Sequence, residues 1–204
     1  MTPKRRRLAD ALLLTPGAGA DRDQSALVAI DDALSADDIA VERMDFPYRR
    51  AGRKAPDRPP VLLRAVRDGA GELAARAGVA PARIALGGRS MGGRICSMAV
   101  AEGLPAAALV LVSYPLHPPG KPERLRTEHF GELRVPSLFV SGTRDAFGAP
   151  EELEAATAAI PGPVTHAWVE GGSHGLRGAD ATVATAVQAW FRSPWVEELG
   201  GDFS

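Results

Sequence analysis

Short runs of apolar residues alternate along the chain with longer segments in which apolar residues recur at every third or fourth position. The short runs are typical of buried β-strands, and the longer segments are typical of amphipathic helices. We expect strands at residues 11–15, 39–44, 83–86, 108–112, 135–140 and 164–169. We expect helices at residues 24–34, 61–77, 95–101 and 181–191, with one more opening at Pro150. This alternation predicts a three-layer α/β fold, with a mostly parallel, twisted sheet of about six strands and helices on both faces.

Two segments between these elements predict loops. Residues 48–60 are rich in Arg, Lys and Pro, and residues 113–134 contain four prolines, which argues against one regular element there. No repeat and no shift in composition divides the chain. We therefore expect a single domain over residues 1–204, with residues 1–8 and 195–204 as tails.

Composition narrows the class of protein. The chain has 204 residues, 45% of them hydrophobic and 24% charged, as in ordinary soluble globular proteins. The net charge of −1 gives no reason to expect binding to nucleic acid or to an anionic membrane. The single cysteine, Cys96, excludes an intramolecular disulfide framework and a Cys-cluster metal site. The basic run at residues 4–7 imitates the start of a signal peptide, but Asp10 interrupts the apolar stretch that follows, and we expect a cytoplasmic protein.

The sharpest chemical signal follows the third expected strand. Residues Gly88–Gly92 read Gly-Arg-Ser-Met-Gly and match the pattern G-x-S-x-G at a strand-to-helix junction. There a tight, strained turn exposes the serine, and glycines stand where a β-carbon would collide. Ser90 is therefore the candidate nucleophile, whereas the plainer alternative makes it only a helix cap.

A serine hydroxyl needs a base within hydrogen-bond reach, and the base needs an acid to orient it. Asp145 follows the fifth expected strand, and His174 lies in a Gly-rich turn after the sixth. The chain order Ser, Asp, His is the order that this architecture uses. His166, inside the last strand, and His129 are interpreted as packed or ordinary polar residues instead.

An acyl-transfer site also needs donors for the oxyanion of the tetrahedral intermediate. The backbone N–H of Met91, directly after the serine, is the expected first donor, and that of Ala18, in the Gly-rich turn after the first strand, is the expected second. That turn could instead be only a connection. Spacing rules out a P-loop and a dinucleotide fingerprint, and no metal-binding pattern is present, so we expect no cofactor and no metal. Arg89, Arg94 and Arg144 either favour an anionic group or are surface and packing residues.

These features resemble the α/β-hydrolase superfamily, and within it the dienelactone-hydrolase-like branch. The chain is most similar to the small hydrolase-like domain shared by a testis-expressed protein and a subunit of a nuclear histone-acetylation complex. The matching stretches are residues 16–19, 46–49, 87–94, 114–122 and 142–145. The resemblance covers nearly the whole chain. One departure is Pro16, which stands where many relatives have His and removes a backbone donor from the first turn.

The resemblance implies a Ser90–His174–Asp145 triad and an oxyanion hole around Met91 and Ala18. It also implies that Phe46, Tyr114 and His117 line the substrate pocket, and that this minimal version of the fold has no lid domain and an open site.

The function expected from the sequence is hydrolysis of a small carboxylic ester, or a related acyl bond, through an acyl-enzyme. The partner would be a small molecule. The alternatives are a catalytically silent scaffold that keeps the fold, and an acyltransferase with an acceptor other than water.

Overall fold

Six strands form one parallel sheet in the computed structural model, which describes residues 7–193. The strands are β1 (Ala11–Thr15), β2 (Ala40–Arg43), β3 (Ile84–Arg89), β4 (Ala108–Val112), β5 (Ser137–Gly142) and β6 (Val164–Val169). Their order across the sheet is β2-β1-β3-β4-β5-β6. The chain starts inside the sheet, adds β2 on one side and then crosses to the other side for β3. The order therefore reverses between β1 and β3, the position where a ligand crevice opens in such sheets.

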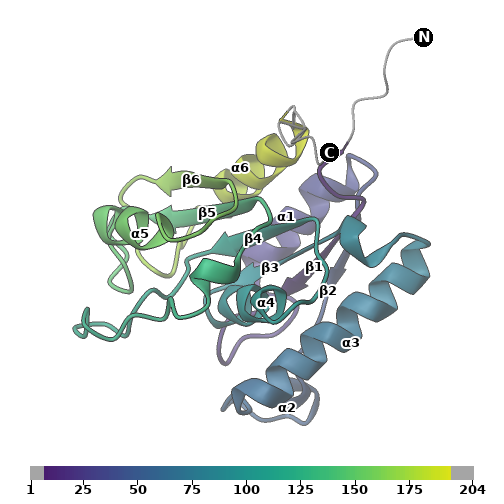
Figure 1. The fold of residues 1–204 in the computed structure, drawn as a ribbon, viewed down its shortest axis with the longest axis horizontal. Helices are drawn as coiled ribbons and strands as arrows, with labels where there is room; N and C mark the ends of the chain where they lie inside the picture. Colours follow the sequence, from purple (N-terminus) through teal and green to yellow (C-terminus); the bar gives the residue numbers. More distant parts are fainter. Residues whose placement is uncertain (1–6, 194–204) are drawn as a thin grey trace, which may run out of the picture.

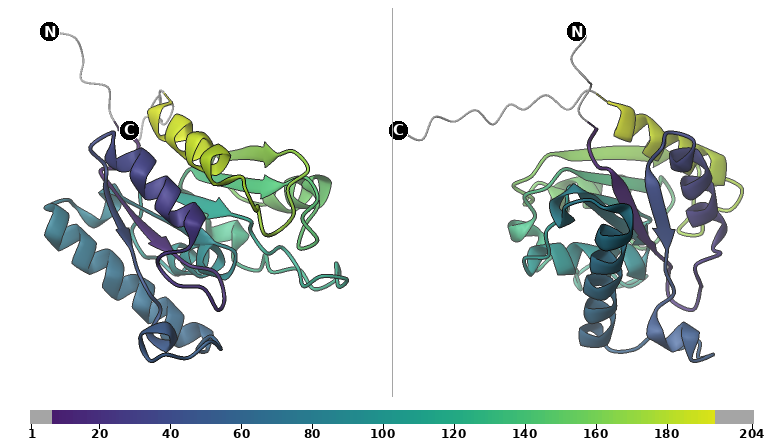
Figure 2. Two further views of the ribbon diagram at one scale, coloured as in Figure 1. Left: turned by 180° about the vertical axis from the view of Figure 1, so that it is seen from behind. Right: turned by 90° about the vertical axis from the view of Figure 1, so that its right-hand side faces the viewer.

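Helices cover both faces of the sheet (Figures 1 and 2). Helices α1 (Ser25–Ser35) and α6 (Asp180–Arg192) lie on one face, and α3 (Pro59–Ala77) and α4 (Met91–Ala101) lie on the other. The short helix α5 (Pro150–Thr157) packs beside β6. Each face has its own apolar core, because alternate residues of every strand point to opposite sides of the sheet. The expected three-layer arrangement is confirmed.

The helix boundaries follow local signals in the sequence. Helix α3 has proline in its first turn, where a missing N–H costs nothing, and ends at Gly78, whose φ of 65° is left-handed. The buried face of α1 carries Leu27, Ile30 and Leu34, the spacing expected of a helix packed on a sheet. The bounds of β4 and β6 are those expected from the apolar runs.

Two expectations are wrong in detail. The segment at 48–60 was expected to be all loop, but a short helix, α2 (Pro47–Arg50), covers its start. Pro47 suits the first helical position, and the buried Tyr48 ring holds the turn against the core. The tail expected at residues 1–8 includes Leu8, which is buried in the core beside α1. The rest of that tail (residues 1–6) and the expected C-terminal tail (195–204) lie outside the described residues.

Across residues 7–193 no connection between strands carries an added domain. Within that range no helix has both the length and the apolar composition needed to cross a bilayer.

Candidate active site

Ser90 sits on a sharp turn between β3 and α4. Its φ of 51° and ψ of −117° are strained for a residue with a side chain, and its N–H donates to the carbonyl of Val112 at 2.8 Å. The turn is possible because glycines let two backbone segments meet. A β-carbon on Gly92 would lie only 2.6 Å from the carbonyl oxygen of Pro16, and one on Gly88 would collide with Thr15. The turn therefore presses against the end of β1 and lifts the Ser90 hydroxyl above the sheet edge.

The structure brings Ser90, His174 and Asp145 together, although each follows a different strand. The Ser90 Oγ lies 2.8 Å from Nε2 of His174. The Nδ1 of His174 lies 2.9 and 3.0 Å from the two oxygens of Asp145. Because an ionised carboxylate only accepts, Nδ1 carries the ring proton, and Nε2 is left free to accept the serine proton.

Asp145 is held rigidly in the turn after β5. Its side chain is only 2% exposed, and its Oδ1 also accepts the backbone N–H of Phe147 at 2.8 Å. The Asp145 N–H in turn donates to the carbonyl of Gly142 at 3.2 Å. A carboxylate fixed in this way holds the imidazole in one orientation.

His174 is restrained by two further neighbours: Phe147, which the sequence did not indicate, and Arg89, which the sequence suggested either for an anionic group or as a surface or packing residue. The Phe147 ring stacks on the imidazole, with ring centroids 3.9 Å apart and planes 24° apart. The guanidinium of Arg89 donates to the backbone carbonyl of His174 at 2.6 Å. Burial lowers the pKa of Arg89 from its ordinary value, but a guanidinium stays charged at any physiological pH. Both residues restrain the loop that carries His174.

Two backbone N–H groups are candidate oxyanion donors, because Met91 and Ala18 line the same cleft as Ser90. Met91 is the first residue of α4, so its N–H has no acceptor inside the helix. In the turn after β1, the N–H of Gly17 donates to Gln24 at 3.1 Å, and the N–H of Gly19 donates to the Tyr48 hydroxyl at 3.2 Å. The N–H of Ala18, between them, has no acceptor among the described residues. Side chains of Gln24 and Tyr48 thus order this turn despite the proline at position 16.

A cleft of about 490 Å³ opens beside Ser90. It is lined by residues from the turn after β1, the ends of β3 and α4, and the loops that follow β4, β5 and β6: Gly17, Ala18, Gln24, Arg89, Ser90, Met91, Arg94, Pro115, Arg126, Phe147 and His174. The expected donors Ala18 and Met91 lie in this lining. Gln24, Arg126 and Phe147 were not expected there, because no local motif marks them.

Three residues expected in the pocket lining lie elsewhere. Tyr114 is buried between the rings of Phe130 and Phe139, and its hydroxyl donates to the carbonyl of Arg126 at 2.6 Å. Phe46 is fully buried and precedes α2.

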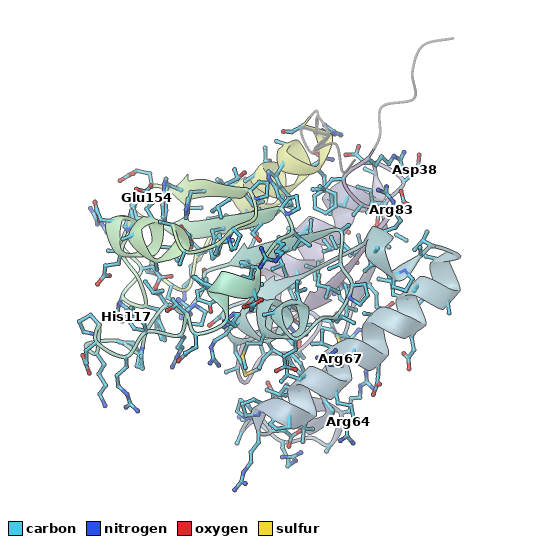
Figure 3. All side chains as sticks on the ribbon, in the orientation of Figure 1. Asp38, Arg64, Arg67, Arg83, His117 and Glu154 are labelled. Carbon is cyan, nitrogen blue, oxygen red and sulfur yellow. The ribbon has the colours of Figure 1, made fainter. Side chains whose placement is uncertain are left out.

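His117, labelled in Figure 3, pairs with Glu152 at 3.3 Å and with the carbonyl of Pro118 at 2.9 Å. Its side chain is only 6% exposed. Like Tyr114 and Phe46, it is buried and is not among the residues that line the cleft.

Three other candidates from the sequence, Arg144, His129 and His166, are not among the residues that line the cleft. Arg144 is exposed and does not line the cleft. His129 is 2.8 Å from the buried Ser97, and His166 stacks between Phe139 and Trp168. In residues 7–193, no group of three or more His, Cys, Asp or Glu side chains is arranged to hold a metal ion.

Comparison with known proteins gives a consistent result. A family model described as an alpha/beta hydrolase domain matches residues 9–193. The chain is similar to the structure of a dienelactone hydrolase from Anabaena variabilis, with 17% identity and a TM-score of 0.72, covering 90% of this chain and 85% of that one. It is also similar to Est1E from Butyrivibrio proteoclasticus, with 15% identity and a TM-score of 0.71, covering 89% and 86%. An alpha-beta serine hydrolase homologue from Coxiella burnetii has 17% identity and a TM-score of 0.69, covering 93% and 86%.

Proposed function

Since the chain is a hydrolase of the α/β-hydrolase domain family, we propose that it cleaves a small carboxylic ester through Ser90, His174 and Asp145. Its likeness to the dienelactone-hydrolase-like branch, expected from the sequence, is confirmed. The observation that carries the proposal is the continuous relay of hydrogen bonds, 2.8 Å from Ser90 to His174 and 2.9 Å from His174 to Asp145.

Acylation begins when Ser90 Oγ attacks the carbonyl carbon of the ester and gives its proton to Nε2 of His174. The carbonyl π electrons move to oxygen, and the N–H groups of Met91 and Ala18 donate to the resulting oxyanion. Asp145 stabilises the imidazolium that has formed. The intermediate then collapses, the C–O bond to the alcohol breaks, and the alcohol leaves with the proton from Nε2.

Deacylation repeats the sequence with water. His174 takes a proton from water as the water oxygen attacks the acyl group on Ser90. Collapse of the second intermediate breaks the bond to Ser90 Oγ, which recovers its proton from His174. The carboxylic acid product is released, and the site returns to its starting state.

Small substrates suit the cleft. A volume of about 490 Å³ is within the range of pockets that take small molecules, and the Ala18 end is exposed. The proposed partner is a small ester, and the proposed reaction involves neither nucleic acid nor a membrane. We also propose that the protein is cytoplasmic, in keeping with its single, buried free thiol at Cys96.

A fluorophosphonate probe tests the mechanism. It should label the wild-type protein covalently and should not label Ser90→Ala. Ser97→Ala is the matched control, because Ser97 also lies 2.8 Å from a histidine but is fully buried. Labelling of Ser97→Ala at the wild-type rate is expected. Equal labelling of wild type and Ser90→Ala would reject the proposal, and no labelling of either would favour a silent scaffold. Product analysis with added alcohols separates hydrolysis from acyl transfer.

A further inference from the structure

The cleft beside Ser90 is lined by cationic side chains and by no acidic one. Arg89, Arg94 and Arg126 all contribute to its wall, whereas no Asp or Glu is among the lining residues. The one carboxylate of the site, Asp145, is buried behind His174 and engaged with it. The positive charge of the wall is therefore not neutralised by the protein inside the cleft.

Arg94 is oriented toward the serine by its place on α4. Its backbone N–H donates to the carbonyl of Ser90 at 3.1 Å, so it lies one helical turn beyond the nucleophile. Helical side chains lean toward the N-terminus of their helix, which directs this guanidinium back over the turn at Ser90. Arg94 forms no ion pair with any described residue, and its Nε is buried without a hydrogen-bond partner.

Arg126 reaches the same part of the cleft from the loop after β4. Its backbone is fixed on both sides, since its N–H donates to the carbonyl of Leu116 at 2.8 Å and its carbonyl accepts the Tyr114 hydroxyl at 2.6 Å. The guanidinium itself makes only a long bond, 3.4 Å, to the carbonyl of Pro115. Burial lowers the pKa of Arg126, and the nearby charge of Arg94 lowers it further.

Other partly buried arginines of this chain are arranged differently. Arg43, Arg49 and Arg83 pair with carboxylates at 2.9, 3.1 and 2.8 Å. The guanidinium groups of Arg94 and Arg126 repel each other as like charges, and Arg126 is partly desolvated. Glu128 acts on Arg126 from nearby, but neither arginine forms an ion pair among residues 7–193. An anion bound to both groups would offset this repulsion. Planar guanidinium donors match the oxygens of a carboxylate in a bidentate arrangement.

We propose that Arg94 and Arg126 form an anion subsite, and that the ester carries a carboxylate on its acyl portion. The inference rests on the proposed function. We assign the carboxylate to the acyl portion of the ester for two reasons. The leaving alcohol must lie next to His174, which protonates it. Arg94 lies on the same helix as Met91, whose N–H donates to the acyl oxygen in the proposed mechanism. Arg89 is excluded from the subsite because its guanidinium is bound to the His174 carbonyl.

Two p-nitrophenyl esters with the same leaving group test the subsite. One is the monoester of adipic acid, which has a free carboxylate, and the other is its methyl ester, which is neutral and of matched length. Wild type should prefer the anionic ester in kcat/KM, chiefly through a lower KM. Arg94→Gln and Arg126→Gln should each reduce this preference by roughly 10- to 100-fold, the range expected for a charged hydrogen-bonded contact.

Arg64→Gln is the matched control, since Arg64 is exposed on α3, where Figure 3 labels it, and does not line the cleft. It should leave the ratio of the two kcat/KM values at its wild-type value. A wild-type ratio near one, or a ratio unchanged in both arginine variants, would overturn the anion subsite while leaving ester hydrolysis intact.

Failure of the proposed function gives a different pattern, with neither ester turned over and no probe labelling. Binding then decides the subsite alone. In isothermal titration calorimetry, the Ser90→Ala protein should bind monomethyl adipate. The double variant that also carries Arg94→Gln should not bind it. Absence of binding would overturn the subsite as well.

Discussion

The ring of Phe147 lies flat against the imidazole of His174, with centroids 3.9 Å apart. The backbone N–H of Phe147 also donates to Asp145, so Phe147 contacts both His174 and Asp145. An aromatic face on one side of an imidazole restricts the plane of the ring, while Asp145 holds Nδ1 so that Nε2 faces Ser90. If His174 is the base that we propose, Phe147 is expected to be a positioning residue for it.

Replacing Phe147 by alanine should lower kcat by about tenfold, because the imidazole then samples orientations that do not meet Ser90. Phe147→Tyr, which keeps the stacked face, should restore most of the activity. The measurement is kcat for a neutral p-nitrophenyl ester, with circular dichroism to verify the fold. A Phe147→Ala enzyme with wild-type kcat, or a Phe147→Tyr enzyme as slow as the alanine variant, would assign the ring a packing role alone.

The N–H of Ala18 can be removed without changing any side-chain contact at the nucleophile. Ala18→Pro deletes this donor and should reduce kcat by about 100-fold or more, the loss typical of one oxyanion-hole donor. Ala18→Gly retains the N–H and is the matched control, with kcat expected within a few-fold of wild type. Equal rates for the two variants would show that the second donor comes from another group.

Two glycines in α3 differ in the space around them. A β-carbon on Gly71 would meet nothing within 4 Å, whereas one on Gly69 would lie 3.1 Å from the sulfur of Met44. Gly71→Ala should therefore raise the free energy of unfolding by about 0.5–1 kcal/mol through helix propensity and reduced freedom of the unfolded chain. Gly69→Ala should raise the free energy of unfolding by less, because the side chain of Met44 has to move. Urea denaturation measures both, and a larger gain at Gly69 would contradict the packing described.

Stability should fall in mild acid because of His129. Burial, and then the charge of Arg94, lower the pKa of His129 to about 4 from its ordinary value of 6.5. Between pH 6.5 and 4 the unfolded chain binds a proton that the folded chain does not, so the free energy of unfolding decreases as pH falls through this window. The ring is partly exposed to water, so we expect a loss of about 1–2 kcal/mol, less than the full shift would give.

Urea denaturation at pH 7 and pH 4.5 measures this loss, and His129→Gln should reduce it. The His129 ring is hydrogen-bonded to Ser97 and packs against the ring of Phe130. The charged groups that act on it are Arg94, Glu128 and Glu102. Burial also lowers the pKa of His166, which adds a smaller change in the same direction. Three carboxyls also have a lowered pKa: Asp10 and Asp37, ordinarily near 3.8, and Glu152, ordinarily near 4.5. Their contribution is lost progressively as pH falls toward and below these values, so the difference between wild type and His129→Gln isolates the histidine. A pH dependence identical in wild type and His129→Gln would exclude His129 as its source.

The sequence alone determined the layers of the fold and the places where chemistry was expected. Apolar runs and helical spacing are local signals, and they predicted the six strands of the sheet. Ser90, Asp145 and His174 were predicted from their places after three of those strands, since parallel strands bring their carboxyl ends to one edge. Their catalytic roles remain a prediction that the labelling experiment tests.

Only the tertiary structure decided which side chains meet. Phe147, Arg126 and Gln24 enter the cleft, and Tyr114 and His117 turn away from it, because long loops place them and no periodic pattern specifies a loop path. The placement of Arg94 and Arg126 in the lining of one cleft brings together an α-helix and a proline-rich loop. Such contacts depend on how separate elements pack, and packing is a property of the whole folded chain.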